Sequence, residues 1–344
     1  MSAPPFVSVI IPCRNEEKFV ARCLDSILAN DYPTDQLEVL VVDGMSEDGT
    51  RAIVKQYAQA YGLVRLLDNP KSIIPAAMNI GIRNACGDII IKMDAHSVYP
   101  LDYVSKCVKY LMEYDADNVG GVLVSKGRDE SAIAKAIALA LAHPFGSGNS
   151  HFRVGSRELR FSDTAAFGCY RRDVFGRVGL YNEELVRSSD MDLNTRLRRA
   201  GGKILLVPQI VAYYYPRSRL GDFFMRNIVD GFWALYPLKF GGRGVRPRHV
   251  VPLACLLTLL AALAAATLAS VLRWVLPAVL GLYAVATLAV SVPVVRRERE
   301  PWLLVLLPIA FGTRHLAYAI GSLCGIVRAV LSFSFWSNLR AWVS

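Results

Sequence analysis

The chain has 344 residues, a formal net charge of +10 and a hydrophobic content of 53%. This length accommodates one complete α/β domain and a further segment, and the apolar excess collects after residue 249. No signature of a nucleic-acid-reading protein is present, and basic residues flank apolar segments, which favours a membrane as their partner. The seven cysteines form no C-x-x-C pair, which favours a reducing compartment. We expect no signal peptide, because the N-terminus leads directly into a strand.

Apolar runs alternate with helical periods in the N-terminal part of the chain, which predicts βαβ units and a mostly parallel sheet. Neither a G-x-G-x-x-G fingerprint nor a Walker loop occurs, so a bound phosphate must be held by side chains or through a metal. The first strands are expected at 7–12, 37–43, 64–67 and 89–94, with helices at 16–29, from about 50 to 61, and at 74–85. Later strands are expected at 119–124, 164–170, 204–208 and 210–215, with a mobile loop at 144–160 and a helix at 190–200.

The C-terminal part is predicted to associate with a membrane. Aromatic residues recur at helical spacing in 220–240, which is typical of an amphipathic helix at a membrane interface, although a surface helix facing a protein core is the alternative. Two uncharged stretches, 250–272 and 275–295, are long enough to span a bilayer. A third, 302–327, is interrupted by polar residues and is consistent with a tilted span, a re-entrant hairpin or two half-spans.

The predicted domains are therefore a catalytic domain at 1–218, an interfacial helix with a basic linker at 219–248, and a transmembrane region at 249–344. Arginines before the first span and after the second outnumber those in the turn between them, which holds only Arg273. By the positive-inside rule, the catalytic domain is predicted to lie on the cytoplasmic side of the cell membrane. The flanking arginines are Arg243, Arg246, Arg248, Arg296, Arg297 and Arg299.

Polar residues follow two of the predicted strands. Asp94 and His96 lie one residue apart after an apolar run, so in extended chain both could reach one divalent cation; a polar loop cap is the alternative. Asp43 ends the second strand, where an Asx-type turn is the alternative. Asp190 is a candidate general base, or a carboxylate favoured by the dipole at a helix N-terminus. The carboxyl ends of parallel strands meet at one edge, so these residues are expected to converge.

Four motifs, in this order and at this spacing, resemble those of the family 2 glycosyltransferases. They are VIIPCRNE at 9–16, VVDGMSEDGT at 41–50, MDAH at 93–96 and SDMDLNTR at 189–196. The resemblance covers residues 6–240 and is greatest with the glucosyltransferases of succinoglycan-type synthesis. It implies a GT-A, Rossmann-like α/β fold, a nucleotide-sugar donor and inversion of the anomeric centre.

The resemblance also implies roles for individual residues. Asp94 and His96 are implied to bind Mn or Mg together with the donor diphosphate, and Asp190 is implied to be the catalytic base. Pro12, Glu16 and Asp43 are implied to hold the nucleoside. The predicted donor-binding residues are, in full, Pro12, Asn15, Glu16, Asp43, Asn79 and Asp94.

Some of these motifs depart from the family pattern. Asp94-Ala95-His96 replaces the usual Asp-x-Asp, and RNIVDGFW at 226–233 lacks the Gln-x-x-Arg-Trp of processive synthases. We therefore predict a membrane-anchored enzyme that adds one sugar from a UDP-sugar, with UDP-glucose expected, to a lipid-linked polyprenyl-diphosphate glycan. Such a step belongs to exopolysaccharide or cell-envelope glycan synthesis. The alternatives are a processive polysaccharide synthase and a non-catalytic membrane scaffold.

Overall fold

The computed structural model describes residues 3–240, 246–268 and 273–332. Arg243 and residues 269–272 of the predicted first span lie outside the described residues. The chain divides into two compact units, one made of residues up to Val124 and of His151–Tyr214, the other of Ser125–Ser150 and residues from Tyr215 onward. The segment 125–150, which the predicted boundaries assign to the catalytic domain, thus groups with the C-terminal helices.

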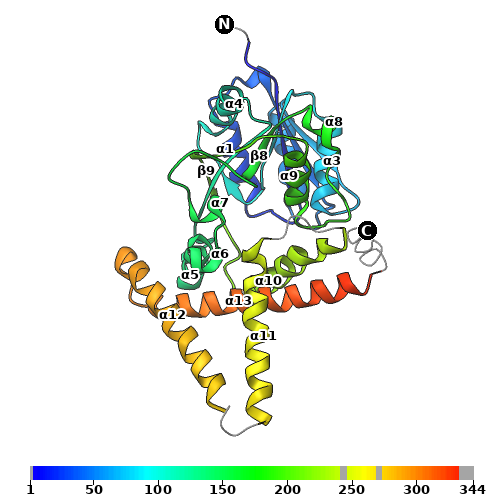
Figure 1. Ribbon diagram of the computed structural model, residues 1–344. Helices are drawn as coiled ribbons and strands as arrows, with labels where there is room; N and C mark the ends of the chain where they lie inside the picture. The colour runs from blue at the N-terminus through cyan, green and yellow to red at the C-terminus, as the bar shows by residue number, and fades with distance from the viewer. Residues whose placement is uncertain (1–2, 241–245, 269–272, 333–344) are drawn as a thin grey trace. The chain divides into compact units, whose positions relative to one another are not determined.

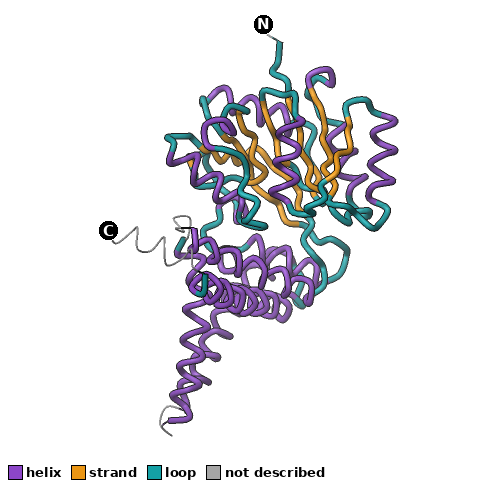
Figure 2. Tube along the Cα trace, turned by 90° about the vertical axis from the view of Figure 1, so that its right-hand side faces the viewer, coloured by secondary structure: helices purple, strands orange, loops and turns teal. Residues whose placement is uncertain are grey.

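The first unit is built on a mixed sheet with helices on both faces (Figure 2). Its central strands are apolar on both sides, as expected for strands covered on both faces. The strands run in the order β3-β2-β1-β4-β8-β6-β9-β5, with β7 paired to β9. They are β1 (Val7–Cys13), β2 (Leu37–Asp43), β3 (Val64–Asp68), β4 (Ile89–Lys92), β5 (Ser97–Val98), β6 (Asn118–Ser125), β7 (Arg160–Phe161), β8 (Ala166–Arg171) and β9 (Ile204–Tyr214).

The first four strands are parallel, and β8 joins the outer side of β4 in antiparallel orientation. Ile10 of β1 is level with Lys92 of β4, so the carboxyl ends of these two strands lie side by side. The two strands predicted at 204–208 and 210–215 form one continuous strand, β9. The parallel arrangement gathers the segments that follow β1, β2 and β4 at one edge of the sheet.

Helices of the first unit cover the sheet in two layers. Side chains of α1 (Val20–Leu28) and α4 (Tyr103–Glu113) pack on one face. Side chains of α3 (Ile74–Asn84) and α9 (Ser189–Arg199) pack on the other. The remaining helices are η1 (Thr34–Gln36), α2 (Thr50–Ala60), α7 (His151–Val154) and α8 (Val174–Val178). The predicted mobile loop at 144–160 is wrong in part, because α6 (Pro144–Ser147), α7 and the first residue of β7 occupy much of it.

The second unit is helical in its described part (Figure 1). Three of its helices are long and apolar enough to cross a membrane. The sequence leaves three interpretations open for residues 302–327. All of these residues except the N-cap Trp302 lie within one continuous helix. Besides α6, the unit contains α5 (Ala132–Ala142), α10 (Leu220–Leu235), η2 (Tyr236–Phe240), α11 (Pro247–Leu268), α12 (Val275–Glu298) and α13 (Leu303–Val330).

Helices α10 and α13 run side by side with their backbones in contact (Figure 1). A Cβ atom built on Gly231 would lie 2.1 Å from the carbonyl oxygen of Tyr318, and one built on Gly321 would lie 1.9 Å from that of Ile228. Only glycine allows so close an approach between two helices. Part of the predicted interfacial helix is also buried by α5, where Phe223 packs on Ile137 and Leu141. Phe232 stacks on Tyr236 with ring centroids 5.0 Å apart.

The polar residues that interrupt the third apolar segment are satisfied inside the second unit. The Arg314 guanidinium donates to the carbonyl oxygen of Gly146 at 2.5 Å and to Asn227 Oδ1 at 2.6 Å. His315 Nε2 lies 2.9 Å from the carbonyl oxygen of Phe145, and its Nδ1 lies 2.9 Å from the Tyr283 hydroxyl. Because each polar group has a partner, α13 passes through this position without a break.

Candidate active site

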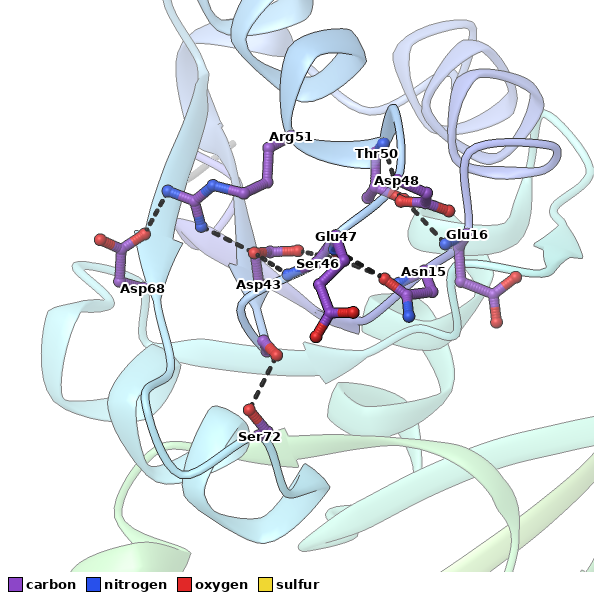
Figure 3. A network of polar contacts seen from close by, with 11 residues as sticks. Asn15, Glu16, Asp43, Ser46, Glu47, Asp48, Thr50, Arg51, Asp68 and Ser72 are labelled. Carbon is purple, nitrogen blue, oxygen red and sulfur yellow. Dashed lines mark hydrogen bonds and ion pairs between the residues drawn. The ribbon is translucent and has the colours of Figure 1, made fainter.

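Two loops at the carboxyl edge of the sheet are bonded to each other (Figure 3). The Asn15 amide donates to Ser46 Oγ at 2.9 Å, and the Glu47 amide donates back to Asn15 Oδ1 at 2.9 Å. The Glu16 amide donates to Thr50 Oγ1 at 2.8 Å. Asn15 has a φ of +53°, a conformation that asparagine tolerates better than most residues. The loops after β1 and β2 therefore form one border of the site, and Pro12 is the last residue but one of β1, three residues before Asn15.

Asp43 is fully buried beneath this border. Its carboxylate accepts from the Ser46 amide at 3.0 Å, from the Ser46 hydroxyl at 2.5 Å and from Arg51 at 2.7 Å (Figure 3). The Arg51 guanidinium also reaches Asp68 at 2.8 Å, and hydrogen bonds to the two aspartates raise its pKa. Asp43 therefore forms the Asx-type turn given as the alternative, and it also holds Arg51. Its predicted contact with a nucleoside remains a prediction.

Asp94 and His96 lie in a tight turn rather than in extended chain, because β4 ends at Lys92 and the Ser97 amide donates to the carbonyl oxygen of Asp94 at 3.2 Å. This differs from the sequence argument, in which alternation along a strand brings the two side chains together. The turn is fixed by the Tyr99 hydroxyl, which accepts from the Asp94 amide at 2.7 Å. Among the described residues, no hydrogen-bond donor reaches the Asp94 carboxylate.

His96 Nδ1 lies 3.0 Å from Glu16 Oε1, and the two side chains are only 24% and 12% exposed. A carboxylate at Nδ1 fixes the proton on that nitrogen and leaves the Nε2 lone pair for a cation, which is how histidine ligands of metals are usually held. The His96 ring also packs on Tyr214, with centroids 5.3 Å apart. Glu16 is thus a partner of the predicted metal ligand, a role that sequence spacing does not reveal.

The residues present fit a divalent cation only in part. Within the described ranges, no three His, Cys, Asp or Glu side chains are grouped to hold an ion. Asp94 supplies a carboxylate and His96 an imidazole, which is a donor set that Mn²⁺ accepts. Mg²⁺ and Mn²⁺ in phosphate-processing sites commonly take one or two protein ligands and complete their coordination with phosphate oxygens and water. Two side chains are therefore sufficient where a nucleoside diphosphate supplies the rest.

Asp190 stands in the first turn of α9, two residues after Ser188, which has a φ of +61°. Its Oδ2 accepts from Lys92 Nζ at 2.5 Å, and 44% of the Asp190 side chain is exposed. Burial by itself lowers the Lys92 pKa, but the carboxylates of Asp190 and Asp94 outweigh it and raise that pKa. Lys92 is therefore an ammonium ion beneath an accessible carboxylate. Sequence reasoning missed Lys92, although a lysine at the end of an Ile-Ile-Ile run is a visible signal.

Asn79 is buried on α3, and its amide is occupied by the loop that leads to α9. It donates to the Tyr181 carbonyl at 2.9 Å and to Glu183 Oε1 at 2.8 Å, and it accepts from the Tyr181 amide at 2.9 Å. Its predicted contact with the donor stays a prediction, and the contacts seen assign it to anchoring the loop before Asp190.

The sheet is mixed rather than mostly parallel as predicted, because β5, β7 and β8 pair in antiparallel orientation. Its four parallel strands, with acidic residues and a histidine after their carboxyl ends, are typical of a nucleotide-binding enzyme of the doubly wound class. Residues 8–179 match the model of the family described as Glycosyl transferase family 2. The succinoglycan biosynthesis protein ExoA of Rhizobium meliloti (strain 1021) is 30% identical over 317 residues, which are 91% of this chain and 92% of that protein. The chain therefore belongs to glycosyl transferase family 2 and is a glycosyltransferase, as its motifs predicted.

Two further proteins resemble the chain over nearly its whole length. A dolichyl N-acetyl-alpha-D-glucosaminyl phosphate 3-beta-D-2,3-diacetamido-2,3-dideoxy-beta-D-glucuronosyltransferase of Methanococcus voltae is 27% identical over 337 residues, covering 95% of this chain and 99% of that protein. The mannosyltransferase PcManGT from Pyrobaculum calidifontis, solved with GDP-Man and Mn²⁺, has a TM-score of 0.58 at 23% identity and covers 96% of this chain and 88% of its own. The predicted fold class, a GT-A-type α/β domain followed by apolar helices, is confirmed.

Proposed function

We propose that the protein transfers one sugar from a UDP-sugar, UDP-glucose in the first instance, to the terminal hydroxyl of a lipid-linked glycan at the cytoplasmic face of the cell membrane. The observation that carries the proposal is the joint presence, in one family 2 chain, of the polar sheet edge with Asp94, His96 and Asp190 and of three apolar helices long enough to cross a membrane. The relatives named for succinoglycan biosynthesis and for a dolichyl-phosphate acceptor support a role in glycan assembly on a lipid.

In the proposed reaction, the acceptor oxygen attacks C1 of the donor sugar and the bond from C1 to the diphosphate breaks on the opposite face. The proton of the acceptor hydroxyl passes to the Asp190 carboxylate, and the nucleoside diphosphate leaves with the bonding electron pair. Inversion at C1 follows from this single displacement. Asp94 and His96 would hold a divalent cation, which when bound would neutralise charge on the diphosphate. Glu16 keeps the His96 ring in its observed orientation.

The charge distribution of the second unit supports the cytoplasmic assignment. Helices α11 and α12 form a hairpin (Figure 1), so Arg246 and Arg248 at its start lie at the same end as Arg296, Arg297 and Arg299 after its return. Basic residues concentrate on the cytoplasmic side of spanning helices. Cys86 is exposed in the first unit and serves as a reporter. In a variant with Cys255 and Cys324 changed to serine, we expect an impermeant maleimide to label Cys86 in inverted vesicles and not in intact cells.

The function is tested by incubating the purified protein with a panel of UDP-sugars and GDP-mannose, Mn²⁺ and a membrane lipid extract. We expect one donor to yield a lipid-linked product longer by a single sugar with an inverted anomeric centre, which rules out processive synthesis. Asp190→Asn should bind the donor as the native protein does and lose about 10²–10⁴-fold in transfer. Single-turnover transfer at the native rate by Asp190→Asn, or long products from a single acceptor, would contradict the proposal.

A further inference from the structure

Lys92 is the feature of the first unit that a packing argument does not explain. It ends β4 after three isoleucines and has a side chain only 10% exposed. Burying an ammonium ion is costly unless a partner compensates it, and methionine or leucine would fill this position in the sheet without that cost. The compensating partner is Asp190, which lies 98 residues further along the chain.

The two members of this ion pair differ in burial, which indicates that Lys92 holds the Asp190 carboxylate in place. Lys92 is the buried member, and Asp190 keeps 44% of its side chain open to solvent. Lys92 extends from a strand inside the sheet, whereas Asp190 stands at the start of a helix. The first turn of α9 is thereby tied to an inner strand of the sheet.

Lys92 also belongs to the strand that leads to the predicted donor metal. It precedes Asp94 by two residues, and β4 is held between β1 and β8. The one ammonium group therefore connects the strand that carries Asp94 to the helix that carries Asp190. Acceptor and donor must meet with reacting atoms about 3–3.5 Å apart, and a displacement of about 1 Å costs on the order of 10²-fold in rate.

We propose that Lys92 is a positioning residue for the transfer reaction, whose hydrogen bond to Asp190 Oδ2 fixes the base carboxylate relative to the strand bearing Asp94. The inference rests on the proposed function, in which Asp190 accepts the proton of the acceptor hydroxyl. Lys92 itself does not touch the substrate in this assignment.

The test compares Lys92→Met, Asp190→Asn and the double variant in the full-length protein. Lys92→Met retains side-chain length without charge and leaves Asp190 solvated, so we expect it to fold. Its kcat for transfer should fall about 10–100-fold, while the KM for acceptor and the Kd for UDP-sugar change less than about twofold. In the Asp190→Asn background, Lys92→Met should cause no further loss of kcat, because a residue that acts through another has no effect once that residue is gone.

Lys106→Met is the matched control. Lys106 of α4 pairs at 2.7 Å with Asp102, the residue before that helix, and Lys106→Met should leave kcat unchanged. Lys92→Gln, which keeps an N–H donor without the charge, is the second variant should Lys92→Met not fold. It should retain a kcat between those of the native protein and Asp190→Asn.

Each contrary result has its own meaning. A rise of tenfold or more in the UDP-sugar Kd with native kcat would assign Lys92 to the donor diphosphate instead. Losses that multiply in the double variant, or a kcat per folded molecule equal to the native value, would reduce Lys92 to a structural residue. In each of these outcomes Asp190→Asn remains inactive, so the proposed function is retained. If Asp190→Asn itself transfers at the native rate, the base assignment fails, and this inference fails with it.

Discussion

The contact between His96 and Glu16 leads to a prediction that separates two roles for Glu16. The family resemblance implies that Glu16 holds the nucleoside, whereas its carboxylate faces His96 Nδ1 at 3.0 Å. If Glu16 orients and polarises the imidazole, then Glu16→Ala should weaken Mn²⁺ binding in the presence of UDP. Loss of such a partner typically lowers metal affinity 10–100-fold, which corresponds to about 1.4–2.7 kcal/mol.

The structure favours the upper part of that range. The two side chains are 12% and 24% exposed, so water replaces the lost hydrogen bond poorly, and hydrogen bonds to charged groups contribute about 1.5–3 kcal/mol. Glu16→Gln keeps an acceptor for the Nδ1 proton but loses the charge, and its effect should be smaller, about tenfold or less. Glu113→Gln, which alters an exposed carboxylate on α4, should have no effect.

The assay is a titration of Mn²⁺ by electron paramagnetic resonance at saturating UDP, paired with calorimetry of UDP binding in EDTA. We expect Glu16→Ala to raise the Kd for Mn²⁺ and to leave the Kd for UDP in EDTA within about twofold of the native value. Native Mn²⁺ affinity in Glu16→Ala, together with a lost affinity for UDP in EDTA, would refute the reasoning and restore Glu16 to the nucleoside.

Three further outcomes are expected. His96→Asp should keep more metal-dependent activity than His96→Ala, and adding Glu16→Gln should raise it further by removing a like charge; equal rates for both His96 variants would contradict this. Gly321→Ala should lower the free energy of unfolding in detergent by about 1–3 kcal/mol and so lower the melting temperature. Gly312→Ala, whose added Cβ would meet no atom within 4 Å, should not. Equal melting temperatures for the two variants would exclude the close packing of α10 on α13. Hydrogen bonds from Lys71 and Asn79 lower the pKa of Glu183 in the folded protein. The stability that these hydrogen bonds confer is therefore fully present above the pKa of glutamate in the unfolded chain, about 4.3. It is lost as the pH falls through the pKa of Glu183 in the folded protein. Glu183→Gln should therefore flatten the fall in melting temperature below about pH 5, and an unchanged slope would rule this out.

The core strands could be predicted because each is a short apolar run between turn signals. Strand β2 has the predicted bounds, and β1 and β3 each extend one residue further. Helix α9 begins at Ser189, one residue before the predicted start. These elements depend on local pattern alone, which is the part of the fold that sequence periodicity reports.

Contacts between distant residues could not be predicted in the same way. Glu16 meets His96 across 80 positions, and nothing in either local sequence selects that partner. Helix α5 was missed although Ser131 caps it, with its hydroxyl accepting from the Ala134 amide at 3.2 Å; an alanine-rich apolar run of eleven residues after a serine is the signal that could have found it. Arg314 was treated as an interruption because its partners, 168 and 87 positions earlier, are invisible from the segment itself.

The arrangement around Arg314 has a consequence for the order in which the protein is made. The carbonyl of Gly146 is synthesised 168 residues before the guanidinium that binds it, which at about 5–20 residues per second is a wait of about 8–34 s. Until then, Ala136 and Ala140 of α5 lack the α13 side chains on which they pack, although Ile137 and Leu141 can already contact Phe223 of α10. The second unit can therefore close only after α13 has been synthesised, and a nascent chain interrupted before α13 would present an unfinished apolar surface to chaperones and proteases.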